Sequence, residues 1–172
     1  IGRHRHGYRT LSQATLEMSP PGANDLALQH QQHQQRQQRR DRGPVAELLG
    51  HRLLAIDRAA SAIDAEFRAQ AHFFNPMGVM QGGFTMAMLE QALLDAVVAL
   101  MGEPCRATTL EMQCNFLAGI GPGVLRCRAS LVRQGRSTAF LEARLFDSGG
   151  TLAATATSVV AVSQAGNGQG GQ

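Results

Sequence analysis

The sequence contains no lysine and no tryptophan, and it has one tyrosine and three cysteines in 172 residues. Its apolar residues make up 44% of the chain, which excludes a wholly disordered protein. The longest apolar stretch, residues 84–101, still contains Glu90, Gln91 and Asp95. Because a membrane span needs about 20 mainly apolar residues, this stretch is too short and too polar, and we expect no membrane association.

Positive charge is concentrated in the first quarter of the chain. Residues 1–44 hold seven arginines and three acids, whereas residues 45–172 hold nine arginines and ten acids. A nucleic-acid-binding protein carries its basic residues on the folded part, within a recognisable module. Neither feature is present, so we expect no nucleic-acid partner.

The three cysteines are isolated from one another. Cys105, Cys114 and Cys127 do not have the spacing of two to four residues that is typical of zinc ligands, so we expect no metal site. An odd number of cysteines argues against a disulfide framework. Unpaired thiols are typical of the reducing cytosol, and we therefore expect a cytoplasmic protein.

Composition divides the chain into one domain between two tails. Residues 1–44 are rich in Gln, His and Arg and bury too little apolar surface to offset the entropy of the chain, which predicts a disordered tail. Residues 164–172 form a second, flexible tail of Gly and Gln. The domain is expected at residues 45–163.

The domain pattern predicts two strands, one long helix and four further strands. Strands are expected at 52–57 and 62–68, the helix at 84–101, and the later strands at 107–117, 124–133, 137–146 and 151–162. Short turns between the later strands imply an antiparallel sheet, and an apolar helix requires that sheet to curl around it. We predict an α+β fold whose single subunit leaves part of the helix and an edge strand open, so that it associates.

Two features of this pattern could carry chemistry. Gly82 and Gly83 lead into the helix, whose N-terminus has unpaired N–H groups and a partial positive charge that could form an oxyanion hole for acyl transfer; alternatively they are only a turn. Glu90 is a carboxylate in an apolar part of the helix, which is often functional, unless it reaches solvent or pairs with an arginine. Asp95 is expected to reach water, and Asn75 could close an Asx turn or orient a substrate.

Taken together, these motifs resemble the hotdog-fold acyl-CoA thioesterases, most closely the PaaI-like group of the phenylacetate pathway. The segments that carry the resemblance are 75–83 (Asn-Pro-Met-Gly-Val-Met-Gln-Gly-Gly), Glu90, 108–117, 134–140 and 150–154. It covers residues 45–163 and is specific as a set. The resemblance implies a long central helix wrapped by a curved antiparallel sheet of about five to six strands, and a homodimer or homotetramer.

The family pattern of Asn, His-Gly-Gly and an acid transfers to this chain position by position. Its members fall on Asn75, Gly82 and Glu90, while Gln81 replaces the histidine and cannot act as a base, although it can donate a hydrogen bond. The resemblance implies that the Gly82 N–H polarises the thioester carbonyl, that Glu90 attacks it or activates water, and that Asn75 orients the thioester or the water. Gln81 and Gly83 would lie beside the substrate.

The resemblance also implies contacts for the rest of an acyl-CoA substrate. A helper hydroxyl in the strand after the helix falls on Thr109, next to Thr108. Arg136, with Arg133 or Arg106, would lie near the coenzyme A phosphates, to which guanidinium groups are suited. No metal or organic cofactor is implied, and the identity of the acyl group stays open.

Helix geometry predicts that the active site is shared between two subunits. Glu90 follows Gly82 by eight residues, which is about 12 Å along one helix. A carboxylate must approach the group it serves to about 3 Å, directly or through one water. Two antiparallel helices related by a two-fold axis would bring each Glu90 to the partner's Gly82 and Asn75.

Two other functions remain open. A hydratase or dehydratase is one, because His72 and Phe73 resemble the His-Phe-Pro opening of the hydroxyacyl-carrier-protein dehydratases, although Phe74 replaces the proline. A non-catalytic acyl-CoA-binding domain of a regulator is the other. Such a regulator needs a DNA-binding module, and residues 1–44 contain no helix-turn-helix pattern.

Overall fold

The structure is a computed structural model that describes residues 43–101 and 105–164. Both predicted tails lie outside the described residues, apart from Gly43, Pro44 and Gln164. The elements, in chain order, are α2 (Gly43–Leu48), β1 (Arg52–Asp57), β2 (Ala62–Ala69), the short 3-10 helix η1 (Ala71–Phe73), α3 (Gly82–Leu100), β3 (Cys105–Phe116), β4 (Gly123–Gln134), β5 (Thr138–Phe146) and β6 (Leu152–Gln164).

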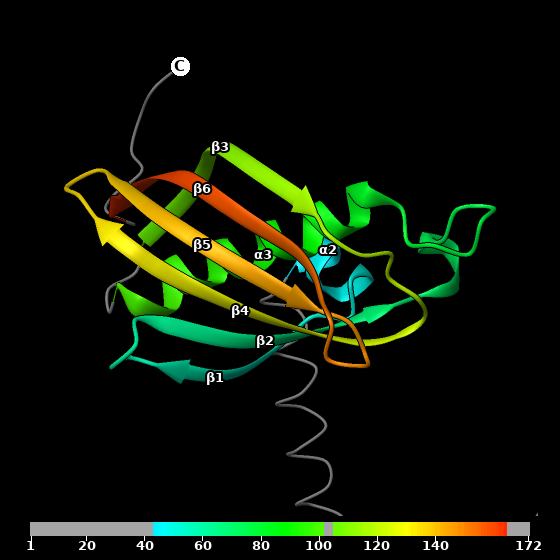
Figure 1. Cartoon of the computed structure of the whole chain (residues 1–172). Helices are drawn as coiled ribbons and strands as arrows, with labels where there is room; N and C mark the ends of the chain where they lie inside the picture. Colours follow the sequence, from blue (N-terminus) through cyan, green and yellow to red (C-terminus); the bar gives the residue numbers. More distant parts are fainter. Residues whose placement is uncertain (1–42, 102–104, 165–172) are drawn as a thin grey trace, which may run out of the picture. The chain divides into compact units, whose positions relative to one another are not determined.

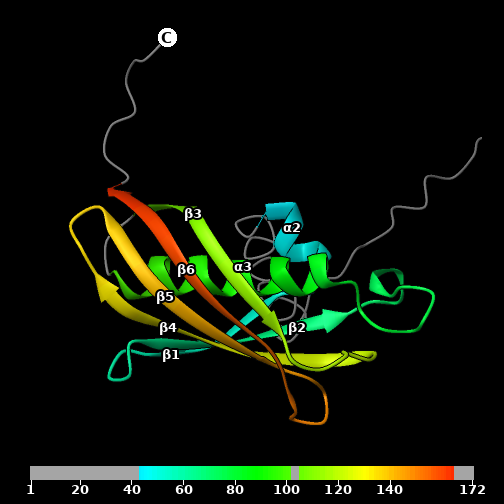
Figure 2. The same ribbon diagram turned by 45° about the horizontal axis from the view of Figure 1, so that its top comes forward.

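The strands form one six-stranded sheet in the order β1-β2-β4-β5-β6-β3, in which all neighbours are antiparallel. The sheet curves around α3, which lies across its concave side (Figures 1 and 2). Strand β3 occupies one edge and β1 the other. The predicted α+β hotdog fold is confirmed.

The alternation of side chains explains how the sheet covers the helix. On β5, Ala139, Leu141, Ala143 and Leu145 are buried, and the residues between them are exposed. Successive side chains of a strand point to opposite faces, so one face of β5 packs on the core and the other meets solvent. The many alanines among the buried residues let the sheet approach α3 closely.

Helix α3 is covered on the side of the sheet and open along one stripe. The buried residues are Thr85, Met88, Leu89, Ala92, Leu93, Ala96 and Val97. The open stripe consists of Met86, Glu90, Leu94 and Val98, which share one helix face because they are four residues apart. Met86 is 37% exposed and Val98 is 52% exposed, while Glu90 and Leu94 are half-buried.

By length and mean hydropathy (1.4), α3 is the one described helix that could cross a membrane. The core helix of a soluble protein passes the same test, and α3 has that position here, since it contacts β2, β3, β4, β5 and β6. Packing against the sheet explains the apolar character of the buried face of α3.

A glycine ends α2 and directs the chain into β1. The Gly50 N–H donates to the Glu47 carbonyl, and the His51 N–H donates to the Ala46 carbonyl. Gly50 has a φ of 61°, and this pair of bonds with a left-handed residue is a Schellman motif. A Cβ at Gly50 would also lie 2.8 Å from the Cβ of Arg68, so only glycine fits.

The motif places His51 in the core beside α3. The His51 ring packs on Phe67 with 5.0 Å between ring centroids, and its Nε2 lies 2.9 Å from Oδ2 of Asp95. The other Asp95 oxygen accepts a hydrogen bond from Gln91. Asp95 is therefore held by protein groups, with its side chain 26% exposed, rather than left to water as we expected.

Candidate active site

A cavity of about 330 Å³ lies at the N-terminus of α3. It is enclosed by the loop before α3, the first turn of α3 and the chain that follows β3. We call it the Gly82 cavity, and its lining consists of Val79, Met80, Gly82, Thr85, Phe116, Leu117, Ala118, Gly119 and Ile120. Its walls are mainly apolar, so it suits an acyl group.

The helix N-terminus supplies unpaired backbone donors to this cavity. Gln81 is the N-cap residue, and its carbonyl accepts the N–H of Phe84 at 3.0 Å. The N–H groups of Gly82 and Gly83 precede that bond and have no acceptor within the helix. A carbonyl oxygen bound at Gly82 would lie at the positive end of the helix dipole, which stabilises developing negative charge.

An aromatic ring lies against the backbone of Gly82. A Cβ there would come within 3.1 Å of Cζ of Phe116, whereas a Cβ at Gly83 would meet no atom within 4 Å. Phe116 is 55% exposed and lines the cavity, so its ring can shift to make room but then changes the wall of the cavity. A side chain at position 82 would therefore press on the wall of the Gly82 cavity.

Asn75 shapes the loop that leads to α3. Its Oδ1 accepts the N–H groups of Met77 at 2.9 Å and Val79 at 3.2 Å. The Asn75 N–H donates in turn to the carbonyl of Val79. The oxygen of the side chain therefore closes an Asx turn, while Nδ2 makes no hydrogen bond within residues 43–101 and 105–164. Asn75 does not line the Gly82 cavity.

Aromatic packing fixes this loop on the helix. The rings of Phe73 and Phe84 stack with centroids 4.1 Å apart, and the Gln81 N–H donates to the Phe73 carbonyl at 2.8 Å. The side chain of Gln81 is exposed and makes no hydrogen bond in the described part of the chain. His72 is also exposed and lies outside the Gly82 cavity.

Glu90 lies two turns further along α3, outside the Gly82 cavity. It is half-buried on the open stripe of α3. Within the described residues its carboxylate makes no hydrogen bond and no ion pair, so the pairing with an arginine that we considered is not observed. A single chain therefore does not bring Glu90 and the Gly82 N–H together.

The residues proposed for the rest of the substrate are also apart from Gly82 in one chain. Thr109 is half-buried on β3, opposite Val160 and beside a bulge. Arg136 is exposed in the turn between β4 and β5, at the end of the sheet where α3 ends rather than begins (Figure 1). Arg133 and Arg106 lie at that same end.

Several residues of the cavity were not recognised from the sequence. Thr85 follows Gly82 by three residues and so shares its helix face, a spacing that could have revealed it. Phe116, Leu117 and Ile120 line the cavity because the chain after β3 turns back toward the loop before α3, where the Met80 N–H donates to the Ile120 carbonyl. No local pattern signals that contact.

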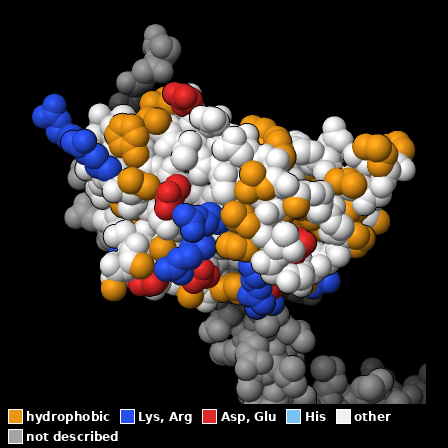
Figure 3. Space-filling view, viewed as in Figure 1, with side chains coloured by type: hydrophobic (Ala, Val, Ile, Leu, Met, Phe, Trp, Pro, Cys, Tyr) orange, Lys and Arg blue, Asp and Glu red, His pale blue; other side chains and the backbone are white. Residues whose placement is uncertain are grey.

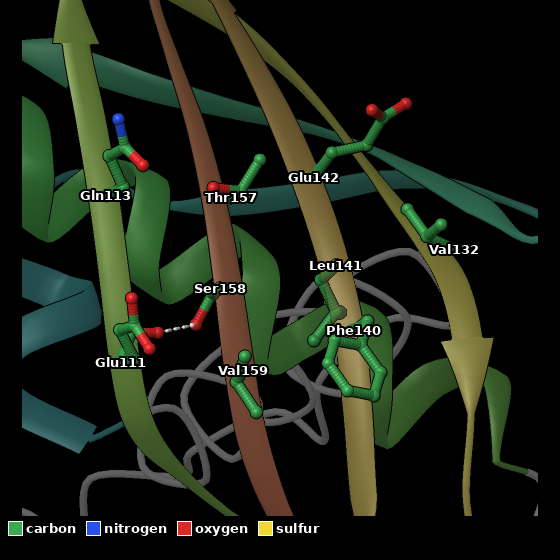
Figure 4. A pocket seen from close by; sticks show the side chains of 9 residues that line it. All are labelled: Glu111, Gln113, Val132, Phe140, Leu141, Glu142, Thr157, Ser158 and Val159. Carbon is green, nitrogen blue, oxygen red and sulfur yellow. Dashed lines mark hydrogen bonds between the residues drawn. The ribbon is translucent and has the colours of Figure 1, made fainter.

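A second hollow, of about 360 Å³, lies on the outer face of the sheet. Side chains from four strands line it (Figure 4): Glu111, Gln113, Val132, Phe140, Leu141, Glu142, Thr157, Ser158 and Val159. The Ser158 hydroxyl is already bonded to the Glu111 carbonyl. None of the residues predicted for chemistry lies there, so we place the site at the Gly82 cavity.

A cluster of ion pairs joins β1, β2 and β4 on the outer face. Arg128 bridges Asp57 at 2.9 Å and Asp64 at 2.8 Å, and Arg126 lies 3.2 Å from Glu66. Basic and acidic side chains accordingly intermix over the sheet in Figure 3. A hydrogen bond from the Ala60 N–H, followed by one from Arg128, lowers the pKa of Asp57 below its usual value.

The cysteines and acids do not form a metal centre in the part of the chain that the structure describes, where no three His, Cys, Asp or Glu side chains could hold an ion together. Cys105, Cys114 and Cys127 are free thiols. Burial, helped by the charge of Asp64, raises the pKa of Cys127 to about 12, so this residue belongs to the core.

Comparison with known proteins identifies similar folds. Residues 77–154 match the thioesterase superfamily. A phenylacetic acid degradation-related protein of Ralstonia eutropha is 34% identical, over 69% of this chain and 90% of its own, with a TM-score of 0.66. No curated protein matches the chain significantly.

Two more distant structures share the fold. The phenylacetic acid degradation protein PaaI of Thermus thermophilus, solved as a mutant, is 24% identical over 69% of this chain and 98% of its own, with a TM-score of 0.61. A thioesterase of Haemophilus influenzae is 19% identical over 73% of this chain and 86% of its own, with a TM-score of 0.66.

Proposed function

Because this chain belongs to the thioesterase superfamily, and within it to the PaaI-like group of hotdog proteins, we propose that it hydrolyses an acyl-CoA thioester to a free acid and coenzyme A. The observation that carries this proposal is the Gly82 cavity, a mainly apolar space that ends at unpaired N–H groups of a helix. The apolar walls suit the acyl chain, and the N–H groups suit the carbonyl oxygen that becomes negative during acyl transfer.

The proposed reaction has three contributors. The Gly82 N–H donates a hydrogen bond to the thioester oxygen and stabilises the negative charge that develops on it. In one route the Glu90 carboxylate attacks the carbonyl carbon, the C–S bond breaks, and water then hydrolyses the mixed anhydride to the free acid and the Glu90 carboxylate. In the other route Glu90 removes a proton from the water that attacks. In both routes the leaving coenzyme A thiolate takes up the proton that the water gives up. The free Nδ2 of Asn75 orients the thioester or the water, while Oδ1 keeps the loop in shape.

We propose that two chains complete each site. The open stripe of α3 and the unpaired edge of β3 are adjacent surfaces, and Leu110 on that edge is 62% exposed. An exposed edge strand of twelve residues is a template for pairing with another chain. Antiparallel packing of two α3 helices covers both stripes and sets each Glu90 beside the partner's Gly82, in a homodimer or a homotetramer.

The same arrangement gives roles to the remaining predicted residues. Antiparallel helices bring the end of α3 near the beginning of its partner, so Arg136 approaches the partner's site, where it can pair with coenzyme A phosphates. Thr109 offers a hydroxyl from β3, and Gln81 and Gly83 flank the thioester. The reaction uses no cofactor, and we place it in the cytoplasm, where free thiols are stable.

A thiol-release assay over a panel of acyl-CoA esters tests the proposal. We expect release by the wild-type protein and a loss of about 100-fold or more in Glu90→Gln, at an unchanged melting temperature. Glu142→Gln is the matched control, because Glu142 is exposed on the outer face of the sheet. Binding of acyl-CoA without thiol release would instead show a non-catalytic acyl-CoA-binding domain. The replacement of the family histidine by Gln81 is compatible with that outcome.

A further inference from the structure

Thr85 is the one residue with a polar side chain in the lining of the Gly82 cavity. It is 2% exposed, and its hydroxyl makes no hydrogen bond to residues 43–101 or 105–164. Because this hydroxyl is not among the fully buried, unbonded side-chain atoms of the described residues, it is open to the cavity and can bond to a ligand there. The mechanism proposed above leaves this hydroxyl unused.

The position of Thr85 relative to Gly82 indicates which ligand atom it meets. Residues three apart on a helix are surface neighbours, with about 5–6 Å between their Cβ positions. A thioester oxygen bound by the Gly82 N–H lies about 3 Å from that nitrogen. The Thr85 hydroxyl can bond to a second oxygen of the ligand at a distance of about 2.8 Å. Both contacts can be made at once by an acyl group that carries an oxygen close to its carbonyl carbon.

We infer that Thr85 is a specificity-determining residue and that the preferred acyl group carries a hydroxyl or keto oxygen on its second or third carbon. The inference rests on the proposed function, because it takes the thioester to be bound at Gly82. The other walls of the cavity, such as Met80, Leu117 and Ile120, are apolar. Apolar walls discriminate weakly between chains that differ by a methylene, whereas a hydrogen-bonding group selects for its partner.

The test compares pairs of substrates that differ by one oxygen. Values of kcat/KM are measured for 2-hydroxybutyryl-CoA, 3-hydroxybutyryl-CoA and butyryl-CoA with wild-type protein, Thr85→Val and Thr85→Ser. We expect the wild type to prefer at least one hydroxylated ester by about tenfold, Thr85→Val to lose that preference, and Thr85→Ser to keep it. If Thr85→Val does not fold, Thr85→Ala is used in its place, because it also removes the hydroxyl.

The outcomes separate this inference from the proposed function. A wild type that prefers butyryl-CoA, or a hydroxyl preference that survives in Thr85→Val, overturns the role of Thr85. If no ester releases thiol, the proposed hydrolysis fails, and the dissociation constants of the same three esters are compared by calorimetry. Tighter binding of a hydroxylated ester that is lost in Thr85→Val then supports Thr85, and equal binding by both proteins overturns it.

Discussion

Gly82 and Gly83 are neighbours in the sequence, but they meet different surroundings. Only at Gly82 would a methyl group press on Phe116. The two glycines were both predicted for the site from their place before an apolar helix, which the sequence reveals. The difference between them was not predictable, because it depends on a ring that lies 34 residues away on β3.

Gly82→Ala should lower kcat/KM by about tenfold or more, because a methyl group displaces the Phe116 ring and crowds the N–H that binds the thioester oxygen. The melting temperature should change little, since Phe116 is largely exposed and can shift. The measurement is steady-state thiol release combined with a thermal melt. Unchanged kcat/KM in a folded Gly82→Ala protein would show that a methyl group at position 82, which leaves the N–H in place, does not crowd the bound thioester.

The thiols should differ in reactivity toward iodoacetamide at pH 8. Burial raises the pKa of Cys127 to about 12, so almost none of it is thiolate, and it is shielded from the reagent. Cys105 and Cys114 have pKa values that are raised by partial burial, but both remain half-exposed and should be alkylated first. Mass spectrometry after timed labelling gives the order in which the three thiols are alkylated. Early labelling of Cys127 in the native protein would contradict its place in the core.

At the scale of elements, most of the fold was predictable because the strands alternate and the helix is uniformly apolar. β1 has the predicted bounds, and α3 begins two residues early because the glycine pair forms its first turn. The pairing of His51 with Asp95 could not be predicted, since it joins residues 44 positions apart. The same holds for the chain at 117–120 that closes the Gly82 cavity.

The turn after α2 should be intolerant of side chains. Gly50→Ala requires a left-handed alanine and a contact of 2.8 Å with Arg68, so we expect a loss of about 1–3 kcal/mol in the free energy of unfolding. Gly121→Ala is the matched control, because a Cβ there meets no atom within 4 Å. Denaturant unfolding of both variants checks this, and equal stabilities would show that the turn can adjust.

The charge cluster on β1, β2 and β4 should appear in the acid dependence of stability. The pKa of Asp57 is lower in the folded protein than its usual value of 3.8, so its stabilising effect is present above that value and is lost as the pH falls below it. Arg128→Met should reduce stability near pH 7 and flatten this acid dependence.

Arg144→Met is the matched control for this cluster, because Arg144 is an exposed arginine of β5 that makes no ion pair in the described part of the chain. Urea unfolding between pH 2.5 and 7 gives the comparison. An acid dependence in Arg128→Met as steep as in the wild type would show that Arg128 does not hold the pKa of Asp57 down.

At the scale of the whole molecule, one chain carries the residues that we propose for a thioesterase site without joining them. The Gly82 cavity and Glu90 belong to the same helix, but they are separated by about two turns. The spacing of Gly82 and Glu90 is visible in the sequence, and it predicts a site that two chains share. The open stripe of α3 and the edge of β3 are the surfaces that we propose a second copy covers.

The measurement that tests this account most directly is complementation between two inactive variants. Glu90→Gln and Asn75→Ala are purified separately, and subunit exchange in the mixture is verified by native mass spectrometry. If each site takes Glu90 from one chain and Gly82 with Asn75 from the other, mixed dimers contain one intact site of two, and thiol release from acyl-CoA should recover to about one quarter of the wild-type rate at statistical mixing. A mixture that exchanges subunits but stays as inactive as its parents would contradict the shared site.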